Sequence, residues 1–454
     1  MATAATLPVA GPAARDRLRR AGALAPVLAV IALLLVPGGG GARGGTGGTG
    51  TVADAASGLL VLICLVRVVR GGARPLTRTA AVVLGLPVLG ICLAAITSND
   101  PASSLPGVAR YVQVFVLVPA AVLLTVRDRR DFAVVAWTLV GLALLQGAVG
   151  VAQYLTGTGA SYQGEDIRAV GTFGATDVMG MATVVSYGLV VVTGIALGSG
   201  PGRARTAALV CAGLLFLPLV LSFSRGAWIA TVLACALQLV LAGPLRAVRV
   251  GLAAGALGVV LVGGLGIGSD LVEQRVASIT RVTGAPDQSV TDRYTMWAAA
   301  GEMWRAEPLT GVGLKGFPQY RDAHASVALS SGSDTAGAGA VFQRQPLLSP
   351  HNMYLLVLSE QGLVGLLALV GSWSALLVGA LRGCRPGSGS GSGSGPGSGL
   401  VSVSGADCAL VATGLLVWQL VDFFYADIGG PSTVLMSVVL GLAAWWSLVG
   451  ARRA

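Results

Sequence analysis

The sequence predicts an all-α fold, a polytopic bundle of about 12 transmembrane helices with one large extracytoplasmic loop that contains short helices. First, the 454 residues are 54% hydrophobic and only 11% charged, with a mean hydropathy of +0.78, whereas soluble domains carry about 25% charged residues. Second, apolar windows recur at lengths mostly near the roughly 17–25 residues that cross a hydrocarbon core. Third, arginines alternate between the connecting loops in the way that orients membrane helices.

The apolar windows account for nearly the whole chain outside one polar loop. They fall at 21–37, 53–69, 79–97, 107–126, 131–155, 176–198, 204–222, 225–243, 247–267, 353–381, 405–425 and 430–450. The weakest is 53–69, because it contains Asp54 and Arg67. These windows divide the chain into a first membrane segment of nine helices at 1–267, a loop at 268–350, and a last segment of three helices at 351–454.

Loop charge predicts the orientation. If the amino end is cytoplasmic, the inner segments hold Arg15, Arg17, Arg19, Arg20, Arg67, Arg70, Arg74, Arg78, Arg127, Arg129, Arg130, Arg203, Arg205, Arg246, Arg249, Arg382, Arg385, Arg452 and Arg453. The short outer connections hold only Arg43, Arg168 and Arg225, with Arg110 near an outer helix end. Positive charge accumulates on the cytoplasmic side of membrane proteins. Both termini are therefore expected in the cytoplasm, and the 268–350 loop outside the cytoplasmic membrane.

Several classes of function are disfavoured. The net charge of +10 would suggest a nucleic-acid partner in a soluble protein, but in this chain it follows from orientation, so we expect no nucleic acid. The six cysteines have no metal-ligand spacing, and no nucleotide-binding glycine motif follows a plausible strand. We therefore expect neither a metal nor another cofactor. Residues 386–400 form a Gly/Ser repeat that is typical of a flexible cytoplasmic linker.

The 268–350 loop is the best candidate for the place of chemistry because it is the long polar excursion of an apolar chain. Residues 291–307 predict an amphipathic helix with Asp292 at its amino end, Pro308 after it and a largely aromatic face, which lies on the membrane surface or packs on the bundle. Residues 310–317, TGVGLKGF, form a glycine-rich turn. Its N–H groups could face a phosphate, but without a preceding strand the signal is weak.

Three polar residues at or within the predicted helices are chemically informative. His351 follows Ser349-Pro350 at the mouth of the next helix. Its imidazole can accept a proton near neutral pH, although a helix-capping or interfacial role would place it there equally well. Arg225 begins a helix at its outer end, where it either grips phosphate oxygens or extends to lipid headgroups. Glu360, nine residues beyond His351, is interpreted as structural.

Three motifs together resemble the O-antigen ligase and polymerase superfamily of bacterial membrane glycosyltransferases. They are Ser224-Arg225-Gly226-Ala227; the segment Asp292 to Trp297 (DRYTMW) followed by Glu307 to Gly313 (EPLTGVG) and Phe317; and His351-Asn352-Met353-Tyr354-Leu355 with Glu360-Gln361-Gly362. The last, in this order after a long loop, is the most specific. The resemblance covers roughly Ser222 to Gly365.

The resemblance implies an enzyme that passes a glycan from undecaprenyl pyrophosphate to an acceptor hydroxyl at the outer face of the membrane, without metal or nucleotide. Its partners would be a lipid-linked oligosaccharide donor and a glycan or lipid-glycan acceptor. Carried over position by position, Arg225 and Arg293 would hold the pyrophosphate and His351 would be the catalytic base. The expected direct displacement would invert the anomeric centre.

Two other functions remain open from the sequence. A transporter or flippase of lipid-linked oligosaccharides would also use outer cations, but transporters commonly show related halves and midplane polar residues, and no internal repeat is evident. A peptidoglycan glycosyltransferase of the shape-and-division type is also polytopic with an outer loop. It would not predict the His351-Asn352 helix start. The sequence leaves open the glycan, the acceptor, and ligase versus polymerase activity.

Overall fold

The structure is a computed structural model, and it confirms an all-α, multi-pass membrane bundle. It describes residues 12–36, 51–71, 76–98, 100–162, 165–200, 202–245, 247–250, 252, 288–326, 329, 347–384, 403–430 and 432–452. Within these ranges nine helices are long and apolar enough to cross a membrane. Two shorter apolar helices, Arg20–Leu33 and Ser432–Leu448, join them.

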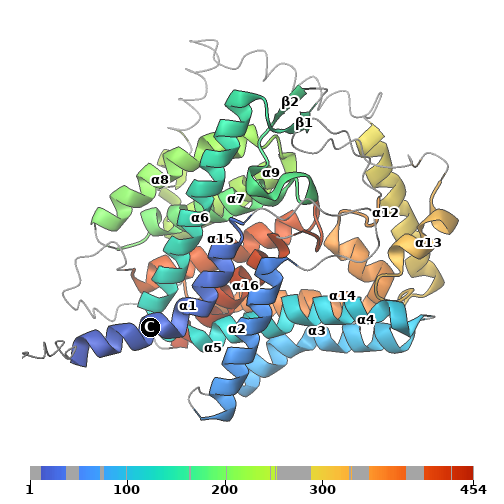
Figure 1. The fold of residues 1–454 in the computed structure, drawn as a ribbon, viewed down its shortest axis with the longest axis horizontal. Helices are drawn as coiled ribbons and strands as arrows, with labels where there is room; N and C mark the ends of the chain where they lie inside the picture. The colour runs from blue at the N-terminus through green and yellow to red at the C-terminus, as the bar shows by residue number, and fades with distance from the viewer. Residues whose placement is uncertain are drawn as a thin grey trace, which may run out of the picture.

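Figure 1 shows how the elements are arranged in space. In chain order they are α1 (Pro12–Leu33), α2 (Val52–Val69), α3 (Arg78–Ile96), α4 (Pro101–Val112), η1 (Gln113–Leu117), α5 (Val118–Thr125), α6 (Arg129–Thr156), β1 (Ala160–Tyr162), β2 (Glu165–Arg168), η2 (Gly171–Thr176), α7 (Gly180–Leu197), α8 (Gly202–Leu221), α9 (Arg225–Ala242), α12 (Gln288–Ala306), α13 (Phe317–His324), α14 (Met353–Arg382), α15 (Gly405–Asp422), α16 (Ser432–Leu448) and η4 (Gly450–Arg452). Strands β1 and β2 form a small antiparallel hairpin.

Eleven of the apolar windows correspond to described helices. The window at 107–126 is one continuous span, Ser104–Thr125, assembled from α4, η1 and α5. The weak window at 53–69 is α2, whose Asp54 lies in the first turn and forms a capping box with Thr51. Because the charge sits at the helix end, it does not interrupt the span. Apart from residues 247–250 and 252, the window at 247–267 lies outside the described residues, and so does the linker at 386–400.

The centre of the bundle is formed by α7, α15 and α16, most of whose side chains are buried. Large aromatic residues fill this interior, including Tyr187, Trp418 and Trp446. The peripheral helices α2 and α8 instead expose leucines such as Leu59 and Leu214. An exposed apolar helix surface is stable only in contact with lipid, so this pattern is that of a membrane bundle.

Close packing with α3 fixes the position of α14, the helix that begins after His351. A side chain at Gly90 of α3 would place its Cβ 2.3 Å from the Cα of Gly365 on α14. Small residues at such a crossing let two helix backbones approach closely. Gly362, three residues earlier, has φ +65° and breaks the helical geometry of α14.

Polar contacts show which residues lie at each of the two ends of the bundle. At one end, the start of α6 meets α1 through the ion pair of Asp128 Oδ2 with Arg20 Nη1 at 2.9 Å, and Arg67 donates to the Ala23 carbonyl at 3.2 Å. The starts of α9 and α14 lie at the other end, which we call the His351 end, with α12 and α13 beside α14 at the edge of the bundle in Figure 1. Arg20 and Arg67 therefore share one end, as the loop-charge pattern requires.

Candidate functional site

Arg225 is the first residue of α9 and is exposed. Ser224 is the N-cap, and its Oγ accepts from the Ala227 N–H at 3.4 Å. The preceding Phe223 has φ +51°, a backbone conformation that residues other than glycine adopt only at an energetic cost. From the hairpin, Arg168 Nε donates to the Ser222 carbonyl at 3.0 Å and holds this turn. The turn directs the chain so that a guanidinium stands at the first position of the helix.

Arg293 lies on α12, which packs against α14. The buried face of α12 is made of Asp292, Thr295, Met296, Ala299, Ala300 and Met303. The helix therefore packs on the bundle mainly through alanine and methionine side chains. Tyr294, which belongs to the predicted aromatic face, is 56% exposed. Asp292 is not the amino-terminal cap that the sequence suggested, because the helix begins a turn earlier at Gln288.

A single hydrogen bond places α12 beside the histidine. The Trp297 indole Nε1 donates to the Pro350 carbonyl at 2.8 Å, immediately before His351. Trp297 is one helical turn beyond Arg293, so the same face of α12 is brought to the start of α14. The predicted aromatic residue thus has a specific task, which is to tie the polar loop to the histidine segment.

His351 is half-buried and has φ +48°. The N-cap of α14 is the next residue: Asn352 Oδ1 accepts from the Leu355 N–H at 3.0 Å. The capping function that could have explained the histidine therefore belongs to Asn352. Burial lowers the pKa of His351 below its ordinary value, Asp427 raises it and Arg293 lowers it again.

The turn between α15 and α16, residues 423–430, is attached directly to the histidine segment. The Met353 N–H donates to the carbonyls of Phe423 at 2.8 Å and Ala426 at 3.1 Å. Asn352 Nδ2 donates to the Phe424 carbonyl at 3.2 Å. A segment some seventy residues away in the sequence thus forms one wall of the site.

The same turn reaches the start of α9. A Cβ at Gly226 would lie 2.8 Å from the Cβ of Tyr425, so α9 meets the turn at the residue after Arg225. Glycine is required there because any side chain would push the turn away. This contact explains why the sequence has glycine directly after the arginine.

The three predicted site residues are linked by charge interactions with one another and with Asp427. Burial lowers the pKa of Arg293, the positive charge of Arg225 lowers it further, and Asp427 and Tyr425 raise it. Arg293 in turn lowers the pKa of His351. Two cations and an imidazole from α9, α12 and the start of α14 therefore share one electrostatic environment at the His351 end.

Asp427 is a residue of this cluster that the sequence pattern did not identify. It interacts with both His351 and Arg293, and its Oδ2 is buried with no hydrogen-bond partner among the described residues. The sequence offers one signal: an acid followed by Gly429-Gly430 between two apolar windows. Spacing alone could not connect it to His351.

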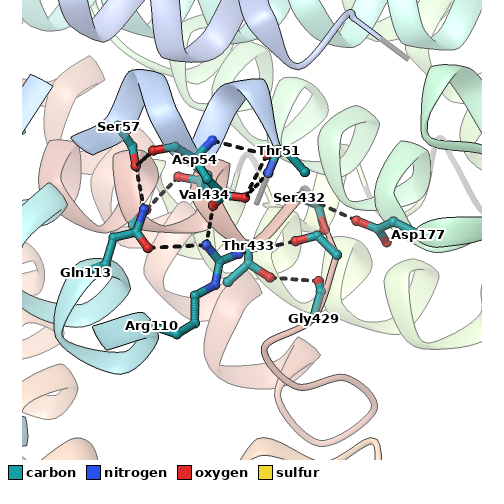
Figure 2. Close-up of polar contacts among 12 residues, drawn as sticks. Thr51, Asp54, Ser57, Arg110, Gln113, Asp177, Gly429, Ser432, Thr433 and Val434 are labelled. Atoms are coloured by element: carbon teal, nitrogen blue, oxygen red, sulfur yellow. Dashed lines mark hydrogen bonds and ion pairs between the residues drawn. The ribbon is translucent and has the colours of Figure 1, made fainter. Parts of the chain in front are cut away.

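The polar network drawn in Figure 2 holds the end of the 423–430 turn and the start of α16. Arg110 of α4 forms an ion pair with Asp54 of α2, and its Nη2 donates to the Gly430 carbonyl at 3.5 Å. Asp177 Oδ2 accepts from the Ser432 N–H at 2.9 Å at the start of α16, and burial raises the pKa of Asp177 to about 6. Arg110 therefore has a structural role, in which it links α2 to the end of the 423–430 turn.

The glycine-rich turn at 310–317 is directed toward the protein. The N–H groups of Val312 and Gly313 donate to the carbonyls of Ser359 and Glu360 at 2.9 and 3.1 Å. The Phe317 N–H donates to Glu360 Oε1 at 3.2 Å. These donors fill the break in α14 beside Gly362, so the N–H groups of this turn are directed to the backbone and the buried carboxyl group of Glu360. The structural interpretation of Glu360 agrees with this arrangement.

The two guanidinium groups and the imidazole are suited to bind an anion and to accept a proton from a hydroxyl group beside it. Guanidinium groups bind phosphate oxygens bidentately, and the imidazole can take a proton when it is neutral. Among the described residues, no three His, Cys, Asp or Glu side chains gather as metal ligands would. The positive charge that the described part of this site offers comes from arginine.

Comparison with known proteins gives one family. Residues 210–370 match the family model Wzy_C, described as O-antigen ligase. The matched stretch contains Arg225, Arg293 and His351 and ends inside α14. No curated protein matches the chain.

Proposed function

We propose that this chain transfers or polymerises glycan from undecaprenyl pyrophosphate onto an acceptor hydroxyl. The proposal proceeds from the match of residues 210–370 to the O-antigen ligase family. The family assignment supports a membrane glycan-transfer function. The observation that carries the finer proposal is the convergence of Arg225, Arg293 and His351 from three separate elements.

Arg225 and Arg293 are the proposed pyrophosphate ligands. The two guanidinium groups repel one another, Arg293 is half-buried, and the single charge of Asp427 offsets only part of their combined positive charge, so a further anion beside them is favourable. A lipid pyrophosphate supplies that anion. Its negative charge grows as the glycosidic bond breaks, so the arginines stabilise the transition state more than the ground state.

His351 is the proposed general base. Its lowered pKa keeps the imidazole neutral at pH 7, which is the form that accepts a proton. The acceptor hydroxyl oxygen attacks the anomeric carbon as its proton passes to the imidazole. The bond from the anomeric carbon to the pyrophosphate oxygen breaks, and its electron pair leaves with undecaprenyl pyrophosphate. The anomeric centre inverts, and no metal is needed because the arginines carry the compensating charge.

The proposed location of this chemistry is the outer face of the cytoplasmic membrane, with both termini inside. The arginine distribution supports it, as does the gathering of Arg20, Arg67 and Arg129 near one end of the bundle, opposite His351. The lipid tail would enter sideways from the bilayer while the sugar projects outward.

The test is an assay with purified protein in sealed proteoliposomes and an undecaprenyl-pyrophosphate oligosaccharide, with and without EDTA. The proposal expects a new glycosidic bond, free undecaprenyl pyrophosphate and a rate unaffected by EDTA. Chain growth identifies a polymerase, and a single transfer to a second molecule identifies a ligase. Movement of donor across the membrane without bond change would refute glycan transfer in favour of a flippase.

A further inference from the structure

The Asp427 carboxylate is unusual among the acids of the described ranges that lie near the site. Glu360 accepts a backbone N–H from the 310–317 turn, and Asp177 accepts one from Ser432. Asp427 Oδ2 is buried and accepts from no described group. An unsatisfied buried carboxylate oxygen costs free energy, so its place in a structure calls for a functional explanation.

The position of Asp427 is fixed from several directions. The start of α14 holds Phe423 and Ala426 through the Met353 N–H, and Arg110 holds the Gly430 carbonyl. On the far side Tyr425 packs on Gly226. The carboxylate is therefore carried by a turn that contacts both the histidine segment and the start of α9, so it is positioned together with them.

The groups that surround His351 and Asp427 have mixed charge. Arg293 of α12 acts on both, and Arg225 of α9 acts on Arg293. Glu360 of α14, Asp422 of α15 and Tyr111 of α4 also interact with Asp427, and Tyr425 acts on Arg293. Asp427 is the acid that acts directly on the imidazole.

We propose that Asp427 is a positioning residue for His351, the buried counter-charge that allows an imidazole beside two arginines to accept a proton. This inference rests on the proposed function. When His351 takes the proton of the acceptor hydroxyl, an imidazolium forms next to the Arg293 guanidinium. The negative charge of the Asp427 carboxylate offsets that repulsion. The imidazolium then returns its proton to solvent after the product leaves.

The inference is tested first without any substrate. The chain has two histidines, His324 and His351, so protein labelled only at histidine has two imidazole signals in NMR, and His324→Gln assigns them. Asp427→Asn is expected to lower the pKa of His351 by about 1, the lower limit of what a neighbouring charge contributes. Asp427→Glu is expected to keep most of the original value. Asp322→Asn, which removes an exposed acid on α13, is the control and should leave it unchanged.

Glycan transfer supplies the second measurement. Asp427→Asn is expected to lower kcat at least about tenfold with little change in the donor KM, and to shift the acid limb of the pH–rate profile to lower pH. The direction follows because a lower His351 pKa keeps the base neutral in more acidic solution. A purely structural role would reduce the amount of active protein without moving the limb. An unchanged His351 pKa and an unmoved limb in Asp427→Asn would overturn the inference while leaving the proposed function intact. If wild-type protein transfers no glycan, the proposed function fails, and the histidine titration still decides whether Asp427 controls His351.

Discussion

At the scale of single residues, two uncommon backbone conformations lie in or directly beside the site. Phe223, Lys315 and His351 are the non-glycine residues with positive φ among those described. Phe223 directly precedes the Ser224-Arg225 helix start, and His351 is itself the proposed base. Backbone conformations of this kind persist only where the surrounding contacts enforce them, and they gather at functional sites.

If His351 is the general base, as proposed, its pKa should set the pH dependence of transfer. Burial and Arg293 lower its pKa, and Asp427 only partly opposes them. A general base works when neutral, so activity should be constant above the His351 pKa and fall as the pH decreases through it. The acid limb of kcat/KM is expected below about pH 6.5, the ordinary histidine value. A limb at higher pH would show that another group titrates.

The two arginines should affect donor use. Arg293→Ala is expected to lower kcat/KM for the lipid-pyrophosphate donor about 10- to 100-fold, as loss of charged hydrogen bonds does, and Arg225→Ala should act in the same direction. Arg305→Ala is the matched control. It lies on the same helix, but its side chain is exposed and paired with Glu302. Unchanged donor kinetics in both Arg225→Ala and Arg293→Ala would remove the pyrophosphate assignment.

At the scale of elements, the site is assembled by helix starts and turns that meet. Hydrogen bonds of Trp297, Asn352 and Met353 join the amino end of α14 to α12 and to the 423–430 turn. The amino end of α9 meets the same turn where Gly226 lies against Tyr425. The break of α14 at Gly362 accommodates the 310–317 turn. This packing of the polar loop into the helix keeps α12 next to His351.

Adding a side chain at Gly311, which packs into the break of α14 beside Gly362, should destabilise the protein. Gly311 has φ +69°, and its Cβ would lie 2.4 Å from the Glu360 carbonyl carbon. Gly311→Ala is expected to lower the free energy of unfolding by about 2 kcal/mol or more, through backbone strain and overpacking. The melting temperature in detergent measures it. Gly301→Ala, within α12 and with open space around it, is the control and should be neutral or slightly stabilising. Equal melting temperatures for the two variants would contradict the packing described.

Sequence reasoning found the spans and α12, and singled out Arg225 and His351, because each carries a local signal, whereas Arg293 was chosen only through the family resemblance. Apolar length marks the spans, and a cation or imidazole at a helix start stands out from its neighbours. Asp427 and the Gly226–Tyr425 contact have no such signal, because they depend on how α15 and α16 fold back on α9 and α14. The cap of α12 was misplaced because Asp292 faces inward one turn after the helix begins.

At the scale of the whole molecule, Arg20 and Arg67 lie at the end of the bundle opposite the proposed site. Arg20 and Asp128 join α1 to α6 at one end, and the site occupies the His351 end. Sidedness can be measured by cysteine labelling of a variant that lacks the six native cysteines. We expect Glu302→Cys to react with a membrane-impermeant maleimide in intact cells. Asp128→Cys should react only after permeabilisation, and the reverse pattern would place the site in the cytoplasm.

The most direct test of the central claim is transfer by purified protein from an undecaprenyl-pyrophosphate oligosaccharide, measured for wild type, His351→Ala and His324→Ala. We expect His351→Ala to lose roughly 10²- to 10⁴-fold in rate, the contribution of a general base, while it folds normally and still binds donor. His324→Ala, which changes the other histidine on α13, should keep wild-type activity. Transfer by His351→Ala at the wild-type rate would contradict the account.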